Sequence, residues 1–186
     1  MEAQKTLKIV NGVNLDTLLT TIKHIQEDPE LAKCKFHITN KWISGTHSES
    51  TVESFYGAKQ EISHESTFNL DSDEPKILAG SDIGPNAAEH LLNALGACIT
   101  TGLVAHAAVR GIHIEELESE IEGDIDIRGF LGLSPDVPKE LTEIRIKVKA
   151  KTDPHNIEQL RELAEFSPVY HTLMKGVNVK LDVEQQ

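Results

Sequence analysis

One cysteine, Cys98, has the residue type and the sequence setting best suited to chemistry. It lies within the stretch Gly84–Arg110, flanked by the small residues Gly96, Ala97 and Gly102. The thiolate is the reactive form of cysteine, and an unperturbed thiol has a pKa of about 8.5, so a nearby cation is needed to activate it at neutral pH. A free cysteine in a helix is also a common small apolar packing residue. Both interpretations of Cys98, reactive thiol and packing residue, stay open.

Three further residues could act with Cys98 or have structural roles. Ser167 could donate a hydrogen bond to the Cys98 sulfur, although capping the short helix that follows it is the favoured role. Glu89 lies near the start of the same predicted helix, where a carboxylate also favours the positive end of the helix dipole. Cys34 could resolve an oxidised Cys98 only if the N-terminal helix folds over the site, and we expect it to be incidental.

The nine histidines invite a metal hypothesis. Four of them could approach one another in a folded chain: His47, His90, His106 and His171. None forms an i, i+4 pair with another histidine, and no cluster of histidine, cysteine and aspartate has the spacing of metal ligands. The glycines of RGFLGL (Arg128–Leu133) do not form a phosphate-loop pattern. We therefore expect no metal and no cofactor.

The helix that carries Cys98 is predicted from Gly84 to Arg110. Gly-Pro-Asn can cap its start, Gly111 can end it, and nearly every side carries apolar or small residues. A helix that is apolar all round is expected to be buried all round. A domain of 186 residues has little core to hide such a helix, so we expect a partner subunit to cover part of it.

The elements that position this helix follow from hydrophobic periodicity. Helical spacing predicts an amphipathic helix over 14–27, begun by Asn14 and ended by Asp28-Pro29, and a second one that begins at Asp153-Pro154. Extended patterns predict strands at 35–42, 48–56, 60–70, 117–128, 144–150 and 177–183, with a short helix at 169–174. Residues Asp71–Asn86 are expected to form a loop, with the acidic residues of DSDEP (Asp71–Pro75) solvated near the pocket mouth. This order predicts an α+β fold with antiparallel sheets.

Bulk composition excludes several classes of function. The formal charge is −12 and the basic residues form no run, which argues against nucleic acid and anionic membrane surfaces. Apolar residues make up 39% of the chain and aromatic residues 4%, typical of an aliphatic globular core. The N-terminal residues lack a signal-peptide pattern, and polar residues within 91–109 argue against a membrane span. We expect a soluble cytoplasmic protein with reduced thiols.

Seven short motifs occur in a specific order, although each one alone is weak. They are DEP (Asp73–Pro75), GPN (Gly84–Asn86), EHLL (Glu89–Leu92), ALGAC (Ala94–Cys98), RGI (Arg110–Ile112), RGFLGL (Arg128–Leu133) and SPVYHTL (Ser167–Leu173). Together they resemble the OsmC/Ohr superfamily of osmotically induced and organic-hydroperoxide-resistance proteins. The resemblance covers roughly residues 36–184. It divides the chain into an N-terminal helical extension, 1–35, and an OsmC-like domain, 36–186.

The resemblance implies an intertwined homodimer with a long buried central helix between antiparallel sheets. Peroxidase members of this superfamily use two cysteines, an arginine and a glutamate near the dimer interface. Cys98 matches the reactive cysteine, and the second cysteine falls at Ser167. The glutamate lies ten residues before the cysteine in those members, which is Ala88 here, while Glu89 lies nine before and would point to the opposite side of a straight helix. The arginine falls near His47, the closest match.

Two functions follow from this correspondence. The first is a stress-response enzyme, a single-cysteine, thiol-dependent reductase of organic hydroperoxides that uses Cys98 and an external thiol reductant. Glu89, His47 and Ser167 complete its expected site. The second is a non-catalytic homodimer that binds a small apolar or thiol-reactive ligand in the interface pocket. A divergent dimer without retained chemistry is a third option.

Overall fold

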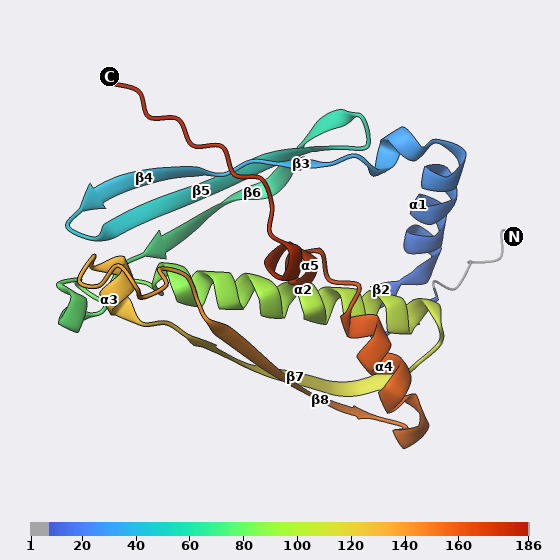
Figure 1. The fold of residues 1–186 in the computed structure, drawn as a ribbon. Coiled ribbons are helices and arrows are strands. Elements are labelled where there is room, and N and C mark those ends of the chain that lie inside the picture. The colour runs from blue at the N-terminus through green and yellow to red at the C-terminus, as the bar shows by residue number, and fades with distance from the viewer. Residues whose placement is uncertain (1–7, 186) are drawn as a thin grey trace, which may run out of the picture. The chain divides into compact units, whose positions relative to one another are not determined.

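The computed structural model describes residues 8–185 (Figure 1). Residues 1–7, which belong to the expected N-terminal extension, and residue 186 lie outside the described residues. The backbone divides into two compact units, Met1–Leu91 and Leu92–Gln186, and each is described by itself. Both units combine antiparallel strands with helices, so the predicted α+β class is confirmed.

The first unit begins with a short hairpin and a helix. Strands β1 (Ile9–Val10) and β2 (Val13–Asn14) pair antiparallel and lead directly into α1 (Leu15–Glu27). The Asn14 side chain accepts a hydrogen bond from the N–H of Thr17 at 3.1 Å, which satisfies one of the unpaired donors of the first turn. A 3-10 turn, Pro29–Ala32, follows the end of the helix. The predicted helix over 14–27 and its cap are therefore confirmed.

An antiparallel sheet fills the rest of the first unit. Its strands are β3 (Lys35–Phe36), β4 (Thr39–Ser44), β5 (His47–Gly57) and β6 (Gln60–Ser72). Strand β5 pairs with all three others, and Figure 1 shows the successive hairpins β4–β5 and β5–β6 as a meander. The predicted meander is confirmed, except that residues 37–38 interrupt the first expected strand.

The long helix α2 (Ala87–Val109) leads into the second unit. Its existence is confirmed, but burial on all sides is wrong for the single chain. Six residues are buried: Leu95, Gly96, Ile99, Leu103, Ala107 and Ala108. The side that carries Ala94, Ala97 and Thr101 is exposed. Because this exposed side consists of small residues, its solvation costs less than that of large apolar side chains.

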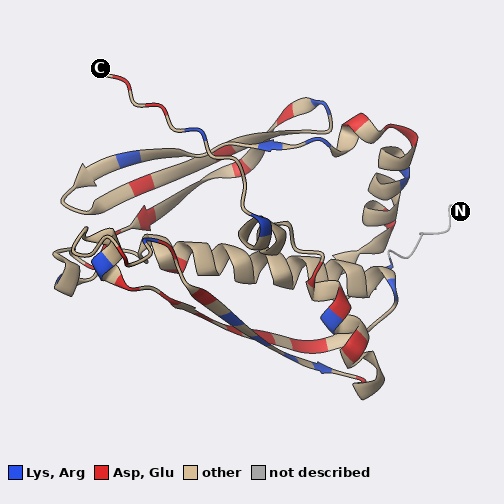
Figure 2. Ribbon diagram, viewed as in Figure 1, with Lys and Arg blue, Asp and Glu red and all other residues tan. Residues whose placement is uncertain are grey.

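Strands β7 (Ile114–Asp124) and β8 (Glu143–Thr152) form the sheet of the second unit. One face is apolar and packs against α2, with Ile121 beside Gly96. The other face is charged, and Figure 2 shows acidic residues along β7 and basic residues along β8. Lys149 and Glu118 pair across the two strands at 3.7 Å. Such exposed pairs contribute little stability, so the apolar face holds the sheet in place.

Short helices make up the rest of the second unit, and one of them contributes to its core. They are α3 (Ile127–Phe130), the 3-10 turn Pro154–Asn156, α4 (Ile157–Ala164) and α5 (Pro168–Lys175). The core cluster joins α2, the start of β7 and α4 through Leu103, Ala107, Ile112, Ile114, Leu160 and Leu163. The helices predicted after Asp153 and over 169–174 are confirmed, with small shifts of their ends.

Two predicted strands differ from the structure. The strand expected over 117–128 begins earlier, at Ile114, and ends at Asp124, because Asp126 caps α3 by accepting from the N–H of Arg128 at 3.0 Å. The strand expected over 177–183 does not form in the single chain. Its alternating apolar residues are 69 to 87% exposed: Val177, Val179, Leu181 and Val183. An extended segment needs a neighbouring strand for its backbone hydrogen bonds, and the described chain pairs none with it.

Candidate functional site

Cys98 lies in the middle of α2, and its side chain is half-buried. Ile99, the next residue, faces the core with 4% exposure, whereas Ala97 before it is exposed. Cys98 therefore lies at the border between the covered and uncovered sides of the helix. A Cβ at Gly96 would lie 2.8 Å from Cδ1 of Ile121, so this side of the helix packs directly against β7. A small reagent can therefore reach the thiol, and the contact between Gly96 and Ile121 holds this part of the helix against β7.

Ser167, the position of the expected second cysteine, is 1% exposed. Its side-chain oxygen accepts a hydrogen bond from the N–H of Tyr170 at 3.2 Å, which makes it the N-cap of α5. Of the two roles that the sequence left open, capping is the one that the structure bears out. The capping oxygen is already engaged by the backbone of its own helix.

A cavity of about 320 Å³ is lined by residues of α2, which carries Cys98, and of α5, which Ser167 caps. Ile99, which follows Cys98, lines the cavity from α2, and Tyr170, whose N–H binds Ser167, lines it from α5. The sequence neighbours of Cys98 and Ser167 thus meet at one hollow of the second unit. The cavity is lined mainly by aliphatic side chains of β8 and α4.

Glu89 and Asn86 form a capping box at the start of α2. The N–H of Asn86 donates to Oε2 of Glu89 at 2.8 Å, and the N–H of Glu89 donates to Oδ1 of Asn86 at 3.0 Å. This reciprocal arrangement satisfies two donors at the helix start. The structural account of Glu89 is therefore supported directly. Nine residues also separate it from Cys98, which places the two on opposite sides of a regular helix.

His47 is held by the end of β6. Its Nε2 lies 2.8 Å from Oδ1 of Asp71, and the side chain is only 16% exposed. The backbone carbonyl of the same Asp71 lies 3.0 Å from Nε2 of His90 on α2. A carboxylate oxygen can only accept in this pairing, so His47 presents Nε2 as a donor. Asp71 thus links the start of β5 to the start of α2 within the first unit.

Asp73 is the residue whose importance sequence analysis missed. It was expected in a solvated loop, yet it is 3% exposed. Its carboxylate accepts from Oγ1 of Thr46 at 2.6 Å and from the N–H groups of Glu74, Ser81 and Ile83 at 2.9 to 3.4 Å. The Thr46 hydrogen bond, helped by the backbone donors, lowers the pKa of Asp73 to about 2.

The loop after Asp73 folds back tightly around this carboxylate. A Cβ at Gly80 would lie 1.7 Å from the carbonyl oxygen of Glu74, so only glycine fits the close approach. Aspartate followed by a loop of glycine, serine and proline is a signal of local backbone hydrogen bonding. That signal could have marked Asp73, although it could not have named Thr46 as a partner.

The predicted site residues fall into two groups. His47 and Glu89 belong to the first unit. His47 is held by Asp71 at the end of β6, and Glu89 is held by Asn86 at the start of α2. Cys98 and Ser167 belong to the second unit. Cys34 is exposed and lies in the first unit. Within residues 8–185, no three histidine, cysteine, aspartate or glutamate side chains gather in a way that could hold a metal ion.

By length and composition alone, α2 is apolar enough to cross a membrane. The central helix of a soluble protein passes the same test, so this is weak evidence. Its packing against β7 and α4 is the behaviour of a core helix.

Comparison with known proteins agrees with this architecture. The model of the OsmC-like protein family matches residues 80–182, more than half of the chain. An OsmC-like protein of Mycoplasma pneumoniae has a similar structure, with a TM-score of 0.56 at 19% identity, covering 76% of this chain and 89% of its own. No curated protein matches the chain by sequence.

A second solved structure comes from Legionella pneumophila and is described as an organic hydroperoxide resistance protein OsmC and a predicted redox protein. It has a TM-score of 0.54 at 17% identity and covers 78% of this chain and 93% of its own. At these identities the likeness concerns the fold, while the family match rests on the sequence of residues 80–182. The chain belongs to the OsmC-like family.

Proposed function

We propose that this protein reduces organic hydroperoxides with Cys98 as a single reactive thiol, in a homodimer that depends on an external thiol reductant. The observation that carries the proposal is the setting of Cys98, a half-buried thiol at the matching position on the central helix of an OsmC-like chain. The Legionella relative is described as a hydroperoxide resistance protein and a redox protein, which supports the same class of chemistry here.

The proposed reaction proceeds in two stages. The Cys98 thiolate attacks one oxygen of the hydroperoxide, an S–O bond forms as the O–O bond breaks, and the alkoxide leaves and takes up a proton to become the alcohol. The resulting sulfenic acid then condenses with one external thiol, releasing water and forming a mixed disulfide. A second external thiol attacks that disulfide and restores the Cys98 thiolate. The net reaction consumes one hydroperoxide and two thiols and gives an alcohol, water and a disulfide.

An external reductant is required because serine occupies the position of the second cysteine. The buried side chain of Ser167 caps α5, and a hydroxyl cannot form a disulfide. We assign Ser167 a role in fixing the wall of the site. In the first unit, His47 is paired with Asp71 through Nε2. Glu89 is assigned to the helix start, where its capping box fixes the beginning of α2.

The homodimer is supported by two exposed surfaces. One is the small-residue side of α2 with Ala94, Ala97 and Thr101. The other is the C-terminal segment 177–183, whose alternating apolar residues are exposed and pair with no strand among residues 8–185. Exposed apolar surface of this extent marks an interaction site, and a second copy of the same chain would cover both surfaces.

The test is the reactivity of Cys98, measured in a Cys34→Ser background so that one thiol is observed. Its rate of alkylation gives the reactivity of the thiol, and its rate of loss with cumene hydroperoxide gives the peroxidatic rate, with Cys98→Ser as the blank. Stoichiometric oxidation and turnover with a dithiol are expected. An inert Cys98 would refute the enzymatic proposal.

An inert thiol would favour the second function, a non-catalytic dimer that binds a small apolar ligand at its interface. The observation in its favour is that Ser167 stands where the resemblance implies a second thiol. Native mass spectrometry of the protein as purified from cells would then show a bound small molecule. A site that is always empty would count against this alternative.

A further inference from the structure

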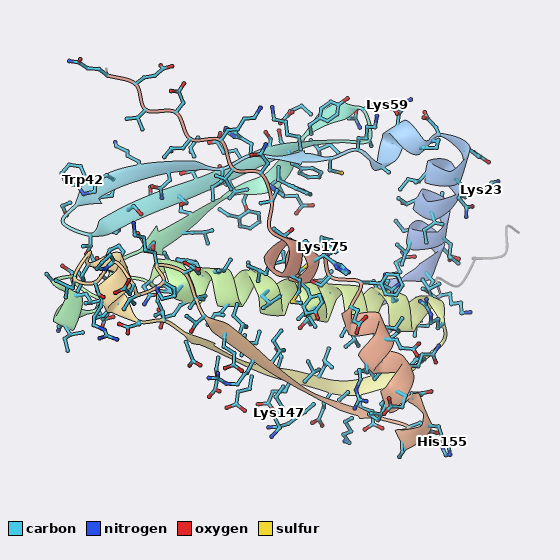
Figure 3. All side chains as sticks on the ribbon, in the orientation of Figure 1. Lys23, Trp42, Lys59, Lys147, His155 and Lys175 are labelled. Atoms are coloured by element: carbon cyan, nitrogen blue, oxygen red, sulfur yellow. The ribbon has the colours of Figure 1, made fainter. Side chains whose placement is uncertain are left out.

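The 320 Å³ cavity of the second unit lies within one chain and is apolar over most of its wall. Ile99 lines it from α2, Ile146 and Val148 from the apolar face of β8, and Leu160 and Ala164 from α4. Figure 3 shows Lys147, between the two β8 wall residues, pointing away from α2. The alternation of β8 thus places aliphatic side chains inside and charges outside. A hollow of this size is at the lower end of the range for small-molecule sites.

The polar residues at the cavity all come from one side, α4 and α5. Arg161 and Glu165 are exposed and Tyr170 is half-buried. Nη1 of Arg161 already pairs with Oε2 of Glu158 at 2.9 Å. Because Glu158 balances Arg161, one net negative charge, that of Glu165, is left among these residues at the mouth of the cavity.

We propose that this cavity binds an uncharged apolar small molecule that carries a hydrogen-bond donor. The aliphatic wall disfavours a charge on the buried part of the ligand, because no wall residue from α2 or β8 could pair with it. The negative mouth repels an anionic group, whereas the Glu165 carboxylate can accept a hydrogen bond from a hydroxyl or N–H. This inference goes beyond the proposed peroxidase, since binding requires no reaction of Cys98.

The charge preference can be measured with two dyes of the same skeleton. N-phenyl-1-naphthylamine is neutral and has an N–H donor, and 8-anilino-1-naphthalenesulfonate adds one sulfonate. We expect saturable binding of the neutral dye, one per chain, with a dissociation constant on the order of micromolar. The sulfonate dye should bind about tenfold more weakly at low salt. Added salt should narrow this difference, because the repulsion at the mouth is screened.

Matched variants locate the binding site. Ala164→Phe fills the cavity and should abolish saturable binding while cooperative thermal unfolding persists. Glu165→Gln should strengthen sulfonate-dye binding about threefold, since one repulsive charge is removed at the mouth. Glu162→Gln removes the same charge from the same helix at a residue that does not line the cavity, and it should have a smaller effect. Cys98→Ser should bind the neutral dye unchanged.

Three results would overturn the inference. Equal binding of the neutral dye to Ala164→Phe and to the unmodified protein would place the dye on exposed apolar surface instead. Absence of saturable binding would show that the cavity is filled, by the C-terminal segment or a second copy. Equal effects of Glu165→Gln and Glu162→Gln would show that Glu165 does not set the charge preference at the mouth of the cavity. None of these results depends on whether Cys98 reacts with peroxides, so the two proposals fail separately.

Discussion

At the scale of single residues, Ser167 is the capping side chain at the start of α5. Its oxygen binds the N–H of Tyr170 in a buried setting. Ser167→Ala should lower the free energy of unfolding by about 1 kcal/mol, and Ser167→Gly by only a few tenths, as is typical of N-cap positions. Urea unfolding of the three proteins measures both differences. Equal stability of Ser167→Ala and the unmodified protein would mean that the cap contributes nothing.

Asp73 makes stability depend on pH in a defined window. Its folded-state pKa of about 2 lies below its ordinary value of 3.8. A lowered pKa means that the folded state holds the proton less tightly than the unfolded chain, so the stabilisation is complete above pH 4. It is lost as the pH falls toward 2. Urea unfolding midpoints measured between pH 7 and pH 2 should therefore fall most steeply below pH 4.

Thr46→Val isolates this contribution, because the Thr46 hydroxyl is the largest cause of the lowered pKa. The variant should be less stable than the unmodified protein at pH 7. The gap between the two should shrink from pH 4 to pH 2, as the carboxylate becomes protonated in both proteins. Thr51→Val changes an exposed hydroxyl hydrogen bond in the same sheet and serves as the control. A gap that stays constant with pH would contradict this account of Asp73.

At the scale of elements, substitutions of Glu89 at the start of α2 distinguish a structural role of this residue from a catalytic one. Glu89→Gln keeps an oxygen acceptor for the N–H of Asn86, so the capping box and the rate of Cys98 alkylation should both persist. Glu89→Ala removes the acceptor and should lower the free energy of unfolding by about 0.5 to 1 kcal/mol. Loss of peroxide reactivity in Glu89→Gln, with stability intact, would restore a catalytic role to this residue.

Elements with local signals were predictable from the sequence, and side-chain hydrogen bonds between distant residues were not. The helix α1 carries its own cap at Asn14 and its own stop at Pro29, so its bounds followed from residues within a few positions. Ser167 likewise caps a helix that begins at the next residue. The burial of Asp73 depends on Thr46, 27 residues away across two strands. No periodicity in the sequence encodes such a pairing.

The segment 177–183 is a clearer example of what a sequence pattern cannot predict. Its alternation of apolar and polar residues correctly identifies a sequence suited to a strand. A strand forms only where another strand offers an edge for pairing. In the described single chain, no strand pairs with residues 177–183. The sequence therefore predicted that the segment is suited to a strand. The pattern could not specify the second strand with which it would pair.

At the scale of the whole molecule, the exposed apolar residues of the C-terminal segment predict self-association. Val177, Val179, Leu181 and Val183 are all more than two-thirds exposed, and a second copy would bury one face of the segment in a continuous sheet. Sedimentation of the protein at micromolar concentration should give twice the chain mass of 20.5 kDa.

Two variants with the same change in charge test which face of the segment is buried. Leu181→Lys places a charge among the apolar residues and should raise the dimer dissociation constant about tenfold or more, because a buried unpaired charge is strongly unfavourable. Asp182→Asn changes the net charge by the same amount at the neighbouring position, which points to the other face of a strand, and should leave the dimer intact. If both variants sediment as dimers of equal mass, the C-terminal segment does not form the interface. If Leu181→Lys alone dissociates, measuring its Cys98 oxidation rate beside that of the intact dimer would decide whether the reactive thiol needs the second subunit.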